Sequence, residues 1–389
     1  MKKILAGVIG TGFIGPAHIE ALRRLGNVQV LALAESSQEI AKTKAHDLGI
    51  KTYYGNYRDL LKNDRIQTVH ICSPNYLHYE MAKAALQAGK HVICEKPLAI
   101  SVKQAQELVL LAENTGLVNA VNFNIRCYPL MRQVKWMIQK GDLGRIFAVQ
   151  GSYLQDWLFH PTDYNWRLEP EQAGASRAVA DIGSHWMDLM EYLTGLKIAE
   201  VCADFATFHK IRKKPLKPVD TYAGKVLRPE DYQEVPINTE DYASVLFRWE
   251  NDGRGVLTVN QVAAGRKNRL AFEVNGSKQS LAWDSELPNQ IWIGKRDGNN
   301  EWMLRDPSLL YPEATALIDY PGGHNEGFPD TFKQMMKEVY AYIAGNRDAI
   351  PAFPTFRDGL RELILCENIY QSNQKRTWVK IQSEGDFYD

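Results

Sequence analysis

A lysine at the end of a predicted strand is the first residue of this chain whose position suits a reaction. Residues 91–98 run from an apolar strand directly into an acid, the base Lys96 and a proline. The proline excludes the helical region for Lys96 and makes a cis bond possible, so rigid backbone aims the ammonium. Because open parallel sheets place ligands at the carboxyl ends of their strands, Lys96 is a candidate catalytic or substrate-orienting cation. The alternative is a surface lysine beside a turn.

Two residues with acid-base chemistry lie four positions apart at the predicted start of a helix, Asp181 and His185. At that spacing both side chains can point the same way. An imidazole in a first helical turn feels the positive end of the dipole, which favours its neutral form, while the nearby carboxylate opposes that shift and fixes the ring. A neutral, oriented imidazole is what a general base for an alcohol requires. The alternative is a capping aspartate and a core histidine.

A glycine-rich loop follows the first predicted strand, residues 4–9, and leads into a helix and then a second strand that ends on Glu35. Glycines at these places allow a tight turn, close approach to a pyrophosphate and close helix-strand packing. Glu35 is placed to accept hydrogen bonds from ribose hydroxyls and to repel a 2′-phosphate, which favours NAD over NADP; a solvated glutamate is the alternative. The predicted cofactor contacts in this loop are Gly10, Gly12, Phe13, Ile14 and Gly15.

Strands alternate with helices through residues 1–123, which predicts a Rossmann-type α/β domain with a parallel sheet. Ser73 and Asn75 then lie on the same carboxyl edge as Lys96, although Ser-Pro-Asn is also a good turn by itself. Residues 124–389 carry long strands of period two and few helices, which predicts an α+β domain on a large, mostly antiparallel open sheet. The C-terminal helices can pack back on the first domain in this arrangement. We expect the chain to form a homodimer or homotetramer through the open face of the sheet.

Composition narrows the class of partner. Lysine plus arginine and aspartate plus glutamate are equal, at 46 each, which argues against a nucleic-acid or membrane partner and is compatible with a small neutral substrate. The five cysteines are widely spaced and form no Cys-x-x-Cys pair, so we expect reduced thiols in a cytoplasmic protein and no metal site. A glycine-interrupted strand at the amino terminus does not predict a signal peptide. Residues 210–234 are basic without aromatic interleaving, which predicts a solvated loop.

Six motifs together resemble the Gfo/Idh/MocA oxidoreductases across essentially the whole chain. They are the Gly10 to Gly15 loop, Ser73-Pro74-Asn75 with His78, Gly89-Lys90-His91-Val92 before Glu95-Lys96-Pro97, Arg126 with Pro129, Gly141-Asp142-Leu143-Gly144, and Asp181 to His185. The resemblance implies that Lys96, Asp181 and His185 are catalytic. It also implies NAD-dependent oxidation of a secondary hydroxyl on a sugar, anhydrosugar or cyclitol. A departure from the family's glycine run, at residues 173–178, affects the expected geometry of that loop and leaves the three residues intact.

Further site residues follow from the motifs. Expected cofactor contacts beyond the glycine loop and Glu35 are Ser73, Asn75, His78, Glu95, Lys96, Asn124, Trp166 and Arg167. The strand end at residues 153–157 resembles the substrate-facing edge of the levoglucosan dehydrogenases within this family, with packed core aromatics as the alternative. Expected substrate contacts are Lys96, Arg126, Tyr153, Gln155, Asp156, Trp157, His185 and His324. Two other functions stay open, namely NAD-dependent glycoside cleavage by transient oxidation and elimination, and a regulator that binds dinucleotide without turnover.

Overall fold

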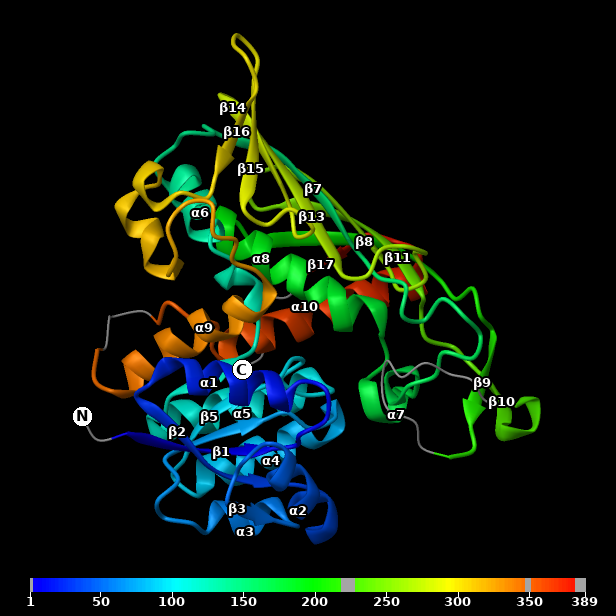
Figure 1. Ribbon diagram of the computed structural model, residues 1–389. Helices are drawn as coiled ribbons and strands as arrows, with labels where there is room; N and C mark the ends of the chain where they lie inside the picture. Colours follow the sequence, from blue (N-terminus) through cyan, green and yellow to red (C-terminus); the bar gives the residue numbers. More distant parts are fainter. Residues whose placement is uncertain (1–2, 218–227, 347–350, 382–389) are drawn as a thin grey trace. The chain divides into compact units, whose positions relative to one another are not determined.

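The computed structural model describes residues 3–217, 228–346 and 351–381, which divide into two compact units (Figure 1). The first unit comprises Met1–Cys127 and Phe328–Leu363, and the second comprises Tyr128–Gly327 and Ile364–Asp389. Residues 328–363, which contain the first of the C-terminal helices, group with the first unit. No helix within the described ranges is long and apolar enough to cross a membrane.

The first unit is built on a six-stranded parallel sheet, as the alternating sequence predicts. Its strand order is β3-β2-β1-β4-β5-β6. Successive strands are added on one side of β1 as far as β3, and from β4 onward they are added on its other side. Ligands bind where the strand order changes side in this way, outside the carboxyl ends of the strands. The strands are β1 (Ile4–Ile9), β2 (Val28–Ala34), β3 (Thr52–Tyr54), β4 (Thr68–Ile71), β5 (His91–Cys94) and β6 (Asn119–Val121).

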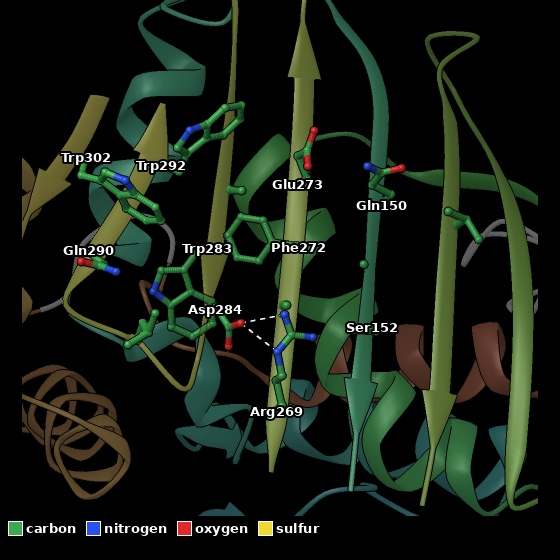
Figure 2. A pocket seen from close by; sticks show the side chains of 15 residues that line it. Gln150, Ser152, Arg269, Phe272, Glu273, Trp283, Asp284, Gln290, Trp292 and Trp302 are labelled. Atoms are coloured by element: carbon green, nitrogen blue, oxygen red, sulfur yellow. Dashed lines mark hydrogen bonds and ion pairs between the residues drawn. The ribbon is translucent and has the colours of Figure 1, made fainter. Parts of the chain in front are cut away.

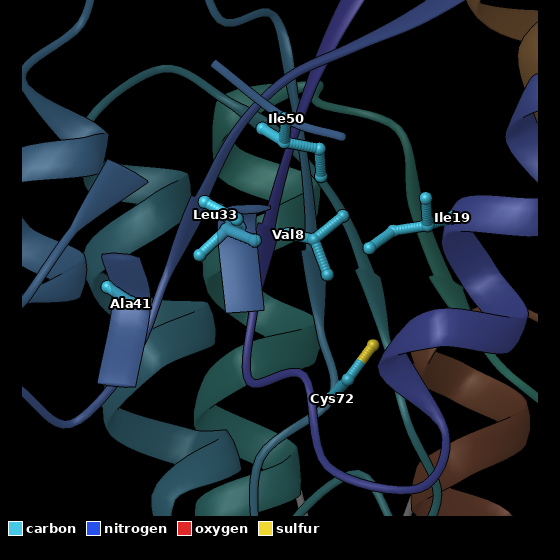
Figure 3. Packing of buried hydrophobic residues seen from close by; sticks show 7 residues of the cluster. Val8, Ile19, Leu33, Ala41, Ile50 and Cys72 are labelled. Atoms are coloured by element: carbon cyan, nitrogen blue, oxygen red, sulfur yellow. The ribbon is translucent and has the colours of Figure 1, made fainter. Parts of the chain in front are cut away.

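Helices from both sequence segments of the first unit accompany this sheet. Ser37 and Ser101 accept hydrogen bonds from the first turns of α2 and α5, which fixes where those two helices begin. Apolar side chains of β1, β2, α1 and α2, including Val8, Ile19 and Leu33, form a core cluster on one face of the sheet (Figure 3). The helices are α1 (Gly15–Leu25), α2 (Gln38–Asp47), α3 (Tyr57–Leu61), α4 (Asn75–Gln87), α5 (Val102–Thr115) and α9 (Phe328–Ile343).

The second unit is built on the predicted open sheet, with nine strands in the order β16-β15-β14-β13-β7-β12-β11-β8-β17. Every neighbouring pair is antiparallel except β12 with β7, so the prediction of a mostly antiparallel sheet is confirmed. The strands are β7 (Ile146–Leu154), β8 (Ile198–Ala206), β11 (Tyr242–Trp249), β12 (Arg254–Asn260), β13 (Arg269–Gly276), β14 (Gln279–Asp284), β15 (Gln290–Lys295), β16 (Glu301–Leu304) and β17 (Val379–Lys380).

One face of this sheet is covered by helix α8, whose Trp186 is completely buried and donates from Nε1 to the carbonyl of Ala271, 3.1 Å away. A Cβ at Gly151 would lie 2.4 Å from that indole nitrogen, so only glycine lets the ring reach the strand. The helices of this unit are α6 (Met131–Gln139), α7 (Pro170–Ala173) and α8 (Ser184–Thr194), and α10 (Phe356–Lys375) begins in the first unit and ends in the second.

The described parts of the basic segment, residues 210–217 and 228–234, are not the solvated loop that composition predicts, and residues 218–227 lie outside the described residues. Residues Ile211–Pro215 (β9) and Tyr232–Pro236 (β10) pair as a two-stranded antiparallel ribbon, and Arg212 is completely buried. Arg212 and Arg177 both form ion pairs with Asp241, whose side chain is also inaccessible to solvent. Arg212 donates in addition to the carbonyls of His160 and Asp163, at 3.0 and 3.1 Å. A charge-based prediction failed here because the partner of Arg212, Asp241, lies 29 positions along the chain, directly before β11.

Candidate active site

The glycine loop of the first unit has the geometry that a bound dinucleotide needs. Gly10 has a φ of 85°, and a Cβ there would lie 2.9 Å from the Cys72 carbonyl carbon, so the turn requires glycine. A Cβ at Gly15 would lie 2.3 Å from the carbonyl oxygen of Gly10, so the helix packs directly on the loop. At Gly12, by contrast, a Cβ would meet nothing within 4 Å, so the loop faces open space there.

The amino terminus of α1 has no side-chain cap and no acidic residue in its first turn. Backbone N–H groups at such a terminus attract the negative charge of a phosphate. Phe13 and Ile14 stand at this turn, with Phe13 64% exposed. These residues therefore fit the pyrophosphate of NAD.

Glu35 lies at the end of β2, where its Oε1 accepts hydrogen bonds from the backbone N–H and the hydroxyl of Thr11. Thr11 is part of the glycine loop, so the loop and the carboxylate fix each other's positions. Within the described residues, both hydrogen bonds of the Glu35 carboxylate are made by Oε1, so Oε2 can accept from a ribose hydroxyl. The position of Glu35 fits the adenosine end of the cofactor.

Lys96 follows β5 and is partly exposed, and the Lys96–Pro97 peptide bond is cis. Beside it, His78 is completely buried under the turn, with Nδ1 2.7 Å from the carbonyl of Pro97 and Nε2 2.8 Å from the carbonyl of Ser73. His78 thus links the Ser73 turn to the Lys96 turn, and it reaches a ligand only through those turns. Asn75, predicted beside Ser73, is the first residue of α4.

Two other predicted residues of the first unit contact the C-terminal segment. Asn124 is buried and donates from Nδ2 to the hydroxyl of Thr331, 2.6 Å away. Arg126 forms an ion pair with Asp358 at 2.7 Å, and only 11% of its side chain is exposed. Burial alone would raise the pKa of Asp358, but the guanidinium of Arg126 and the hydrogen bonds from Thr355 hold it below its ordinary value.

In the second unit, Asp181 and His185 lie on one continuous helical segment, a π turn (Val179–Gly183) followed directly by α8. His185 therefore lies more than one turn beyond the start of the helix. The effect of the helix dipole is confined to the first turn and does not reach that position. The backbone N–H groups of Arg177 and Val179 at that start already donate to the carboxylate of Glu240. The expectation that His185 lies in the first turn of a helix, where the dipole would favour its neutral form, is wrong for this reason.

Asp181 is held from two sides. Gln261, at the end of β12, donates from Nε2 to its Oδ2 at 2.8 Å, and Nε of Arg167 lies 3.4 Å from its Oδ1. The guanidinium of Arg167 also stacks over the ring of Trp166, 4.3 Å from the centroid. Sequence reasoning did not identify Gln261, because a glutamine after a strand carries no distinctive signal.

The predicted substrate edge forms a row of hydrogen bonds at the end of β7. Trp157 donates from its indole nitrogen to Gln155, at 2.8 Å, and Gln155 donates to Oδ1 of Asn268, at 2.7 Å. The Tyr153 hydroxyl donates to the same oxygen, at 2.8 Å, and its ring lies 6.3 Å from that of His185, centroid to centroid. The sequence analysis did not identify Asn268, because this residue follows a loop of ordinary turn residues. In the structure its Oδ1 accepts from both Tyr153 and Gln155 and so connects the row.

Two predicted substrate residues stand apart from that row. The carboxylate of Asp156 accepts from Lys267 at 2.6 Å and from the backbone of Gly265 at 3.1 Å, so it anchors the loop after β12. His324 is exposed, with Nδ1 3.2 Å from the carbonyl of Gly322, and its loop is held by buried Arg305.

Comparisons with known proteins agree over the whole chain. Residues 4–123 match an oxidoreductase family with an NAD-binding Rossmann fold, and residues 131–282 match the GFO/IDH/MocA C-terminal domain. Levoglucosan dehydrogenase of Pseudarthrobacter phenanthrenivorans is 28% identical over 395 residues, which cover 98% of this chain and 99% of that protein.

Two solved structures have the same fold. An oxidoreductase domain protein from Kribbella flavida gives a TM-score of 0.89 at 31% identity, covering 98% of this chain and 100% of that one. Levoglucosan dehydrogenase in complex with NADH and L-sorbose gives 0.87 at 27%, with the same coverage. With both family domains matched in order, this chain belongs to the Gfo/Idh/MocA family and is an NAD-binding oxidoreductase.

Proposed function

We propose that the protein oxidises a secondary hydroxyl of a sugar, anhydrosugar or cyclitol. The observation that carries this proposal is the row of donors and acceptors on Tyr153, Asn268, Gln155 and Trp157, close to His185. Hydroxyl groups of a carbohydrate can replace partners in these hydrogen bonds. The faces of indole rings can pack against the C–H groups of a sugar ring. The similarity to levoglucosan dehydrogenase along the full chain supports the same substrate class.

We propose that Lys96, Asp181 and His185 act together on that hydroxyl. Bound NAD supplies the acceptor for the hydride that leaves the carbon. The imidazole of His185 takes the hydroxyl proton, and the ammonium of Lys96 donates a hydrogen bond to the oxygen while negative charge develops there. Asp181, fixed by Gln261 and Arg167, orients the assembly. Only the hydroxyl proton and one hydride leave the substrate, so the product is a ketone.

A panel of aldoses, inositols and anhydrosugars, incubated with NAD and monitored at the NADH absorbance, tests this function. Net NADH formation with one compound and its ketone as product is the expected result. Release of an aglycone without net NADH would replace oxidation by the glycoside-cleavage alternative. Tight NAD binding without turnover of any compound in the panel would favour a regulator.

For the cofactor, we expect NAD to be preferred over NADP by at least about tenfold in kcat/KM, because Glu35 would repel a 2′-phosphate. The variant Glu35→Ser should narrow that preference. Glu20→Ser, which removes an exposed carboxylate on α1, serves as the matched control and should leave the ratio unchanged. Equal efficiency with NAD and NADP in the native protein would contradict the proposed role of Glu35.

We also propose that a second copy of the chain covers the outward face of the nine-stranded sheet. This face holds a hollow of about 510 Å³, and Figure 2 shows the indoles of Trp292 and Trp302 and the Arg269–Asp284 ion pair along it. Trp302 is 59% exposed, and Leu246 on β11 adds a further exposed apolar side chain. Such an apolar surface is typical of contacts between protein chains.

The expected result is a dimer or tetramer when the molecular mass is measured by light scattering at micromolar concentration. Trp302→Glu should dissociate it, because a carboxylate would be buried without a partner. Leu309→Glu changes a side chain that is 69% exposed outside the sheet and is the matched control. A native protein that stays monomeric under these conditions would refute the proposed contact.

A further inference from the structure

Four buried polar side chains form a continuous chain across the first unit. The hydroxyl of Tyr340 on α9 lies 2.9 Å from Nε2 of His70 on β4, and Nδ1 of His70 lies 3.0 Å from Nδ1 of His18 on α1. Nε2 of His18 lies 2.9 Å from Oε1 of Glu95, directly after β5. Tyr340, His70 and His18 are completely inaccessible to solvent, and Glu95 is 7% exposed.

The protons of this chain can be assigned from the carboxylate outward. Burial alone would raise the pKa of Glu95, but the hydrogen bond and the charge of His18, followed by the charge of Lys96, lower it to about 2. Ionised Glu95 only accepts hydrogen bonds, so Nε2 of His18 must carry a proton and donate. Burial lowers the pKa of His70 well below its ordinary value, so the ring of His70 holds one proton.

Two arrangements satisfy these conditions. When His18 holds one proton, His70 donates from Nδ1 to His18, and Tyr340 donates to His70. When His18 holds two protons, both of these bonds reverse. The bond from His18 to Glu95 is the same in either case. Tyr340 is completely buried, so this series of hydrogen bonds ends inside the unit. In both arrangements its effect is the same, namely that His18 holds the carboxylate of Glu95 in place.

Glu95 in turn contacts the residue that we propose to be catalytic. Its second oxygen, Oε2, accepts from the backbone N–H of Lys96 at 3.3 Å, while Asn122 donates to Oε1 together with His18. The backbone of Lys96 is therefore tied to a carboxylate whose own position is set by His18. The negative charge of Glu95 also attracts the ammonium of Lys96.

We propose that His18 is a positioning residue of the reaction, which acts through Glu95 to fix the backbone and charge surroundings of Lys96. The inference rests on the proposed function in one respect, that Lys96 acts on the substrate oxygen. Loss of the His18 donor leaves Oε1 of Glu95 held by Asn122 alone among the side-chain donors named above, so the carboxylate can rotate or take up a proton more easily. Either change loosens the contact that holds the Lys96 amide.

The test compares three variants in the full-length protein. His18→Ala removes the donor; His18→Gln keeps an amide N–H that can reach Glu95 but carries no titrating proton; His46→Ala removes a histidine whose side chain is 89% exposed. Should His18→Ala not fold, His18→Met fills the space without a donor. Each variant is first checked for NAD binding and for its unfolding temperature.

The first measurement is hydrogen exchange of the Lys96 backbone amide, which needs no substrate. We expect exchange to accelerate by about tenfold or more in His18→Ala and to stay near the native rate in His18→Gln and His46→Ala. The second is steady-state kinetics, in which His18→Ala should lower kcat by about 10–100-fold with KM for NAD within about threefold of native. His18→Gln should recover most of that loss.

An unchanged exchange rate at Lys96 in a folded His18→Ala variant would overturn the proposal, as would equal loss of kcat in the alanine and glutamine variants. If the native protein oxidises no compound of the panel, the proposed function has failed. The exchange measurement then still decides whether His18 fixes Lys96.

Discussion

Replacing His185 with alanine lowers turnover of the true substrate by about 10²–10⁴-fold, the usual worth of general-base assistance, while NAD still binds. Lys96→Ala lowers turnover by about 10²–10³-fold, the loss expected for one donor to a developing oxyanion, with a smaller change in cofactor affinity. If both residues act on one proton and one oxygen, the double variant is little worse than the poorer single variant. Steady-state kinetics with NAD titrations measure all three.

Matched controls separate these effects from general damage. His46→Ala and Lys62→Ala remove an exposed histidine and an exposed lysine of the first unit, and neither should change turnover. The oxidation rate of the native protein should also fall as the imidazole of His185 becomes protonated. Near-normal turnover by His185→Ala would place the base elsewhere, and Lys96 would be the next residue to test.

The second large effect concerns the stability of the second unit. Asp241→Ala should lower the free energy of unfolding by about 3–5 kcal/mol, because Arg177 and Arg212 would remain buried without their shared counter-charge. Both guanidinium groups and the carboxylate are fully inaccessible to solvent. Thermal or urea unfolding measures the loss. Glu301→Gln breaks an exposed pair with Lys295 and should change stability by at most about 1 kcal/mol.

The same carboxylate predicts a pH dependence. Burial alone would raise the pKa of Asp241, but the charges of Arg177 and Arg212 and their hydrogen bonds lower it below its ordinary value of 3.8. The stabilisation is therefore complete above pH 3.8 and is lost as the pH falls from there toward the lowered pKa. An Asp241→Ala variant as stable as the native protein would contradict the premise that Arg177 and Arg212 stay buried without a counter-charge.

Sequence patterns predicted those features that depend only on the residues of a single helix, strand or turn. Period and glycine spacing predicted the sheet of the first unit and the loop from Gly10 to Gly15, because turn geometry depends on the residues of the turn. The start of α4 is a local feature of the same kind. Pro74 occupies the N-cap position, so the helix begins at Asn75.

Features that depend on two distant elements were not predictable in this way. Periodicity indicates which face of an element is buried but does not identify the partner across it. Tyr340 contacts His70 across 270 positions, and Asn268 contacts Tyr153 across 115. Arg212 resembles a surface charge in the sequence, and its buried partner Asp241 becomes evident only from the tertiary contact between their side chains. The expected dipole effect at His185 failed because the π turn moved the start of the helix back to Val179.

The division of the first unit into two sequence segments has a consequence for its synthesis. The 200 residues from Tyr128 to Gly327 separate the two segments, and a ribosome needs about 10–40 s to add them at about 5–20 residues per second. Throughout that interval the nascent chain contains His70 but not yet Tyr340. The second unit also waits, because β17 pairs with β8 and is made after the other described strands. Although the Rossmann segment emerges first, neither unit can finish folding before the chain from Phe328 onward has left the ribosome.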